Sequence, residues 1–80
     1  MPAIYVKANL AWAAAIRAVR AKARLTQEEL ADALGINQQD VSKLEIGRRP
    51  LRAAEIPVLA KACKMTPQAL FDVFKALYEA

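Results

Sequence analysis

The chain lacks histidine and has a single cysteine, Cys63, among its 80 residues. A tetrahedral zinc site needs several imidazole or thiolate ligands and a disulfide needs two cysteines, so the sequence supplies neither. It also lacks a Ser–base or Cys–base pair and a glycine-rich phosphate loop, the usual means of covalent and phosphoryl chemistry. We therefore expect no enzyme, no metal site and no cofactor, and we interpret Cys63 as a buried core residue.

Glycine and aromatic residues are also scarce, and this bears on the fold. The chain has two glycines and 6% aromatic residues, yet 56% of it is hydrophobic, mostly as alanine, and this composition favours helices over sheets. Its length suffices for one modest core, so residues 1–80 are predicted to form a single all-α domain. The apolar run from Leu10 to Ile16 is too short to cross a bilayer, and we expect a cytoplasmic chain without a membrane partner.

Positive charge is in excess, and it is distributed unevenly. Residues 1–52 hold nine lysines and arginines against five acids, whereas residues 53–80 hold three of each. A polyanionic partner such as nucleic acid is therefore plausible for the first two thirds of the chain. On composition alone, the alternative that these cations merely solvate alanine-rich helices is equally good.

The first helix is expected over about 10–23, because Trp12 and Ile16 begin an apolar stripe at helical spacing after Asn9, a candidate N-cap. Ahead of it, residues 3–6 alternate in a way that is typical of a short strand or an extended arm. Such a segment could pair with a symmetry mate or cover the last helix.

Two short helices should follow, with three residues between them. Thr26 and Glu29 form a capping box that begins the second helix, and Gly35 ends it. The third helix is expected over about 38–46 and is ended by Gly47. Two short helices separated by so few residues must cross steeply.

The stretch from Gln27 to Ile46 resembles the helix-turn-helix of Cro/repressor-type regulators of bacteria and phages. The agreement in residue type and spacing covers the apolar positions, the alanine at the closest helix contact and the glycine of the turn: Leu30, Ala31, Leu34, Gly35, Ile36, Val41 and Leu44. The similarity extends over roughly residues 10–71, and it implies a five-helix lambda-repressor-like DNA-binding domain with its helix-turn-helix at 27–46.

The same resemblance implies a structural salt bridge and shows some departures. Arg20 and Glu45 occupy positions that commonly form an ion pair between the first and third helices of this family. Arg24 and Lys64 stand where glycine often ends a helix, and Ile46 stands where a polar residue often touches phosphate.

The third helix has two faces when its residues are placed at about 100° intervals around the axis. One face is apolar. The opposite face is predicted to read bases in a major groove, since glutamine can pair with adenine and lysine with guanine or a phosphate. The predicted readout residues are Gln38, Gln39, Ser42 and Lys43. The alternative is that the two glutamines only make a helix surface soluble.

Phosphate contacts are expected beside this face. The N–H groups and the dipole at the start of the second helix favour an anion, and the family often uses the matching glutamine there. Arginines just past the third helix can grip the DNA backbone or solvate a loop, and Asn37 serves equally as N-cap or contact. The predicted backbone set is Thr26, Gln27, Asn37, Arg48, Arg49 and Arg52.

One helix-turn-helix reads only a few base pairs, so we expect a homodimer on a palindromic site. The last helix, begun by Thr66 and Pro67, carries Phe74, Leu77 and Tyr78 beyond the region of resemblance. These three residues are candidates for the dimer interface, and packing within the monomer is the alternative.

The resemblance therefore implies a sequence-specific transcriptional regulator, most simply a dimeric repressor that reads a palindromic operator in double-stranded DNA. An antitoxin or a restriction-modification controller protein of the same fold stays open. A protein-interaction module that no longer binds DNA is a further alternative, and a toxin or RNA polymerase is then a candidate partner.

Overall fold

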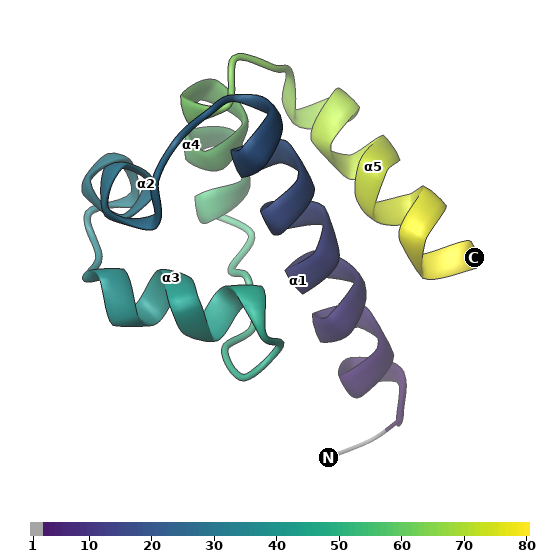
Figure 1. Ribbon diagram of the computed structural model, residues 1–80. Helices are drawn as coiled ribbons and strands as arrows, with labels where there is room; N and C mark the ends of the chain where they lie inside the picture. The colour runs from purple at the N-terminus through teal and green to yellow at the C-terminus, as the bar shows by residue number, and fades with distance from the viewer. Residues whose placement is uncertain (1–2) are drawn as a thin grey trace.

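The computed structural model describes residues 3–80, and helices make up most of that range (Figure 1). In chain order they are α1 (Ala3–Lys22), α2 (Gln27–Leu34), α3 (Gln38–Glu45), α4 (Glu55–Ala62) and α5 (Pro67–Glu79). This range contains no strand, which confirms the all-α, five-helix prediction. None of these helices is long and apolar enough to cross a membrane.

The first helix begins at Ala3, so the prediction of a start at Leu10 was too late. Asn9 lies inside α1, and residues 3–6, predicted as a strand or an extended arm, form its first turn. The physical reason is that no glycine or proline interrupts α1, whose alanines propagate a helix readily beyond its packed part. The short alternation of apolar residues could not outweigh that propensity.

The core lies between the five helices, with α1 packed against α3 and α5, α2 against α3 and α4, and α4 against α5. Figure 1 shows α1 and α5 side by side, with α3 also against α1 and α2 crossing α3 steeply. Trp12 of α1 stacks on Phe74 of α5, with ring centroids 4.2 Å apart. The buried cluster contains Ile16, Val19, Leu30, Ala31, Val41, Leu44, Leu59, Ala60, Cys63 and Leu70.

Two helices end at a left-handed residue that is not glycine. Arg24 and Lys64 each have φ of 59°, so both cationic residues adopt the conformation that glycine commonly supplies at this position. After each, the next amide turns back onto the helix: Leu25 N donates to Arg20 O at 3.1 Å, and Met65 N donates to Ala60 O at 2.9 Å. The departure from glycine is therefore accommodated by backbone strain and not by a different cap.

Gly47 is needed where α3 ends. Its φ is 79°, and a Cβ added there would lie 3.0 Å from Leu10 Cδ2 of α1. Glycine adopts this positive φ without strain and leaves room for the leucine side chain. The predicted end of the third helix is thus confirmed, with Ile46 as its C-cap.

Candidate nucleic-acid interface

The third helix has the two faces that its sequence predicts. Its inner side is buried in the fold and consists of Val41, Leu44 and Glu45. On its outer side Gln38, Gln39 and Lys43 are exposed and Ser42 is half-buried. All four predicted readout residues thus lie on one short helix, and its outer surface offers amide, hydroxyl and ammonium groups to a ligand.

Both helices of the motif are capped at their N-termini by side chains. Asn37 accepts a hydrogen bond from Asp40 N at 2.8 Å, so its side-chain oxygen caps α3. Thr26 accepts from Glu29 N at 3.0 Å while its own N–H donates to Glu29 Oε1 at 2.9 Å, which is the predicted capping box. These caps fix where each helix begins, and hence where Gln27 and Gln38 stand.

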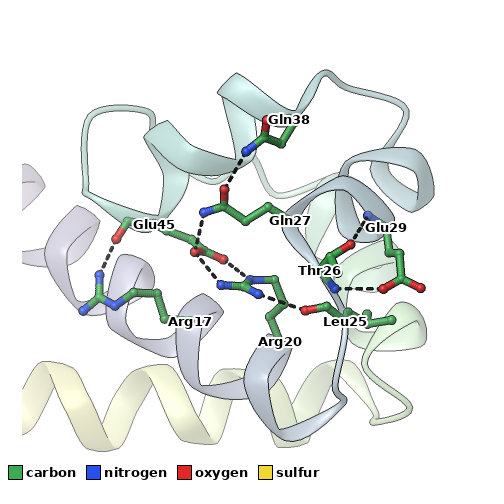
Figure 2. Close-up of polar contacts among 8 residues, drawn as sticks. All are labelled: Arg17, Arg20, Leu25, Thr26, Gln27, Glu29, Gln38 and Glu45. Carbon is green, nitrogen blue, oxygen red and sulfur yellow. Dashed lines mark hydrogen bonds and ion pairs between the residues drawn. The ribbon is translucent and has the colours of Figure 1, made fainter.

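The predicted salt bridge between Arg20 and Glu45 joins α1 to α3 (Figure 2). Arg20 Nε and one of its terminal nitrogens donate to the two carboxylate oxygens of Glu45, at 2.5 and 3.0 Å. Glu45 is 3% exposed, and this bidentate pairing compensates for the burial of its charge. The bond to Glu45 is the main reason that the pKa of Arg20 is raised above its ordinary value.

The ion pair continues as a chain of side-chain hydrogen bonds to the outer face. Gln27 Nε2 donates to Glu45 Oε1 at 2.9 Å, and Gln38 Nε2 donates to Gln27 Oε1 at 2.8 Å (Figure 2). The series from Arg20 to Gln38 therefore runs from the half-buried edge of the core to the first residue of α3. It restricts the orientation of the Gln38 amide before any ligand binds.

A second arginine of α1 also contacts the end of α3. Arg17 donates through one terminal guanidinium nitrogen to the main-chain carbonyl oxygen of Glu45 (Figure 2). Arg17 is itself exposed, whereas Arg20 is half-buried. The two arginines thus bind the same residue at its main chain and at its carboxylate.

The arginines that follow α3 differ in their surroundings. Arg48 and Arg52 are exposed. The Arg49 guanidinium is bound to the Glu55 carboxylate by two hydrogen bonds of 2.9 and 2.7 Å, and both side chains are only 14% exposed. This hydrogen-bonded pairing lowers the pKa of Glu55 and raises that of Arg49. Arg49 therefore holds the loop to the start of α4, which is a role that the sequence pattern did not indicate.

Several contacts could not be found from spacing alone. The Arg49–Glu55 pair spans an irregular loop, and the Gln27–Gln38 bond depends on the angle between two helices. A signal existed for Arg17, because it stands three residues before Arg20 and thus on the same side of α1. Its bond to Glu45 required the position of α3 to be known.

The three candidate interface residues of α5 are used in different ways. Phe74 is half-buried against Trp12, and Tyr78 is half-buried beside Phe74, with Lys7 Nζ 4.6 Å from the centroid of its ring. Leu77 is 40% exposed. The monomer therefore uses most of the surface of the two aromatic residues and leaves Leu77 open to solvent.

The single cysteine behaves as a core residue, as predicted. Cys63 belongs to the buried cluster, and burial is the main cause of the raised pKa of its thiol. A raised pKa decreases the thiolate fraction at neutral pH and hence the reactivity.

Comparisons with known proteins agree with this geometry. The chain is similar to the clp gene regulator ClgR from C. glutamicum, with 25% identity, 86% of this chain and 90% of that chain covered, and a TM-score of 0.78. It is also similar to the restriction-modification controller protein C.AhdI from Aeromonas hydrophila, with 28% identity, 88% and 100% of the two chains covered, and a TM-score of 0.77. No match was found among curated protein sequences.

The family model described as a helix-turn-helix domain matches residues 12–74 of this chain, which include all of α2, α3 and α4. The match covers most of the chain and contains every predicted readout and backbone residue. This chain therefore belongs to the family of helix-turn-helix domains, and it is a DNA-binding transcriptional regulator of the Cro/repressor-type fold.

Proposed function

We propose that the chain is a dimeric repressor that reads a palindromic operator with Gln38, Gln39, Ser42 and Lys43. The observation that carries this proposal is the outer face of α3, which exposes polar hydrogen-bonding groups while the inner face is buried. A helix placed in this way can insert into a major groove, whose base edges carry a distinct donor and acceptor pattern for each base pair.

Gln38 is the residue best prepared for base recognition. One of its two Nε2–H groups donates to Gln27, which leaves the second N–H and the Oε1 acceptor free. This remaining pair matches the N7 acceptor and N6 donor of adenine. We therefore propose an adenine opposite Gln38 in each half-site, with Gln39 and Lys43 reading the neighbouring pairs.

The phosphate contacts are proposed to come from both sides of α3. The N-terminal amides of α2, beside Thr26 and Gln27, and the exposed guanidinium groups of Arg48 and Arg52 supply the positive potential. Because the Arg49 guanidinium is neutralised by Glu55, we give Arg49 a structural role here. Asn37 retains its capping role, since its side-chain oxygen already accepts from Asp40.

The first test is a selection from randomised duplex DNA at near-physiological salt, followed by measurement of the mass of the selected complex. An enriched inverted repeat that is bound by two chains is the expected result. Gln38→Ala should then weaken binding to that site by about 1–3 kcal/mol while binding to random duplex is unchanged. Gln68→Ala, an exposed glutamine of α5, is the matched control and should change neither affinity.

The backbone contacts have a separate signature. Arg48→Ala should weaken binding to every duplex and reduce the slope of log affinity against log salt by about 1. Arg49→Ala should mainly lower the stability of the fold, because it removes the partner of Glu55. If Arg49→Ala instead reduced the slope of log affinity against log salt by about 1, with stability unchanged, Arg49 would be a phosphate contact.

Dimer formation is proposed to use the apolar surface of α5 that the monomer leaves exposed. Leu77 is 40% exposed and Phe71 is 45% exposed, and Phe74 and Tyr78 lie beside them in the aromatic cluster. Leu77→Lys should convert the dimer to a monomer that binds half-sites weakly. Ala76→Lys, the neighbouring exposed position, is the control and should remain dimeric.

A second candidate function is a controller protein of a restriction-modification system, since the whole length of C.AhdI is similar to 88% of this chain. The two proposals differ in the location of the operator. Matching the selected half-site to the promoter of the chain's own gene, and to genes for a nuclease and a methyltransferase, would favour the controller. Selection of no sequence, with weak salt-sensitive binding alone, would instead favour a module that binds a protein such as a toxin or RNA polymerase.

A further inference from the structure

The last carbonyl groups of α3 are satisfied in two ways. The amides of the following loop bond to the carbonyl groups of Lys43 and Leu44, with Arg48 N to Lys43 O at 2.9 Å and Gly47 N to Leu44 O at 3.3 Å. The carbonyl of Glu45, the last residue of α3, instead accepts from the Arg17 guanidinium of α1. A cation at this end also complements the negative pole of the helix dipole.

We propose that Arg17 is a positioning residue that fixes the tilt of α3 and thereby the base-reading register of Gln38. This inference rests on the proposed function of α3. Val41 and Leu44 pack the inner face of α3 into the core, and Arg20 binds the Glu45 carboxylate at the end of a flexible side chain. Arg17 adds an attachment to the main chain of the same residue, which restricts the residual tilt of α3 at this end.

The length of α3 makes this attachment matter at its far end. Gln38 and Glu45 are the first and last residues of the helix, which places them about 10 Å apart along its axis. A tilt of about 10° about the Glu45 end would therefore move Gln38 by about 2 Å, which is more than a bidentate base contact tolerates. The chain of hydrogen bonds from Glu45 through Gln27 restrains Gln38 as well, but it consists of flexible side chains.

The competing role for Arg17 is a direct phosphate contact, since its side chain is exposed and belongs to none of the ion pairs found in residues 3–80. The two roles predict different results for one substitution. A positioning residue affects the cognate complex and leaves the counterion release unchanged. A phosphate contact affects every complex and the salt dependence together.

The test compares Arg17→Ala with Lys22→Ala in the full chain. Lys22 is the matched control because it is an exposed cation near the end of the same helix, with no hydrogen bond to α3. Affinities for the selected site and for random duplex are measured over a series of salt concentrations. We expect Arg17→Ala to lose roughly tenfold in affinity for the selected site, with random-duplex affinity and salt slope unchanged. Equal losses on both duplexes, with a shallower slope, would overturn the proposal in favour of a phosphate contact.

A second measurement does not depend on DNA. Hydrogen exchange of the Gly47 and Arg48 amides, which bond to the last turn of α3, should accelerate in Arg17→Ala and not in Lys22→Ala. Unchanged exchange in Arg17→Ala would refute the attachment itself. If the wild-type chain selects no DNA sequence but these amides respond as expected, the proposed function fails while the attachment of α3 by Arg17 stands.

Discussion

The charge of Glu45 should be among the most costly to remove from this protein. Its carboxylate accepts two hydrogen bonds from Arg20 and one from Gln27, and the residue is 3% exposed. Glu45→Gln keeps the shape but removes the charge, and it turns an amide N–H₂ toward a guanidinium. Breaking one partner of a buried ion pair costs about 3–5 kcal/mol. Because the Arg20 side chain is 21% exposed and recovers some hydration, we expect a loss of about 2–3 kcal/mol.

That loss is large for a domain of this size. At roughly 0.05–0.15 kcal/mol per residue, 80 residues give a free energy of unfolding of about 4–12 kcal/mol. The midpoint of thermal unfolding should fall by roughly 8–24 °C, at about 4–8 °C per kcal/mol. Urea denaturation followed by circular dichroism measures the change, provided that the slope with urea concentration is the same in both proteins.

The control is Glu79→Gln at the end of α5. Glu79 is 4.0 Å from Lys75 and both side chains are more than half exposed, so this substitution should cost less than about 0.5 kcal/mol. If Glu45→Gln costs no more than Glu79→Gln, the Arg20–Glu45 pair does not stabilise the fold and the reasoning is refuted. A double-mutant cycle with Arg20→Met and Glu45→Met then gives the coupling between the two side chains. The double variant leaves no unpaired charge, so its stability gives the net contribution of the pair.

Three further substitutions test other features. The bond to Arg49 lowers the pKa of Glu55 in the fold, so ionised Glu55 adds to the free energy of unfolding above its unfolded pKa, and this stabilisation is lost as pH falls through the folded pKa. Glu55→Gln should therefore be less stable than the wild type at neutral pH and approach it in strong acid. Denaturation at several pH values measures this difference. Lys64→Gly should raise the free energy of unfolding by about 0.5–1 kcal/mol, because glycine relieves the positive φ, and a decrease would show that the cap is unstrained. Gly47→Ala should cost about 1–2 kcal/mol from its positive φ and the close Leu10 side chain, and a neutral effect in thermal melts would contradict the need for glycine there.

Much of the fold followed from local chemistry that the sequence states directly. Thr26 with Glu29, Asn37, and Thr66 with Pro67 mark helix starts because their side chains satisfy free amides, or in the case of proline remove one, within one turn. The buried positions of α2 and α3 follow from helical periodicity, and so does the outer face with Gln38, Gln39 and Lys43. The beginning of α1 did not follow, because an alanine-rich helix has no residue at which it must start.

The amino-acid sequence by itself thus determined the all-α class, most of the helix caps and the polar outer face of α3. The pairing of Arg20 with Glu45 followed from the resemblance of the sequence to known regulators. Tertiary structure alone decided which cations are free. Arg49 is neutralised by Glu55, and Arg17 donates to the last carbonyl of α3. The sequence alone does not show that these two arginines have these partners. The physical reason is that which groups lie within reach of a charged side chain depends on the angles between the helices, and those angles arise from the packing of the whole core.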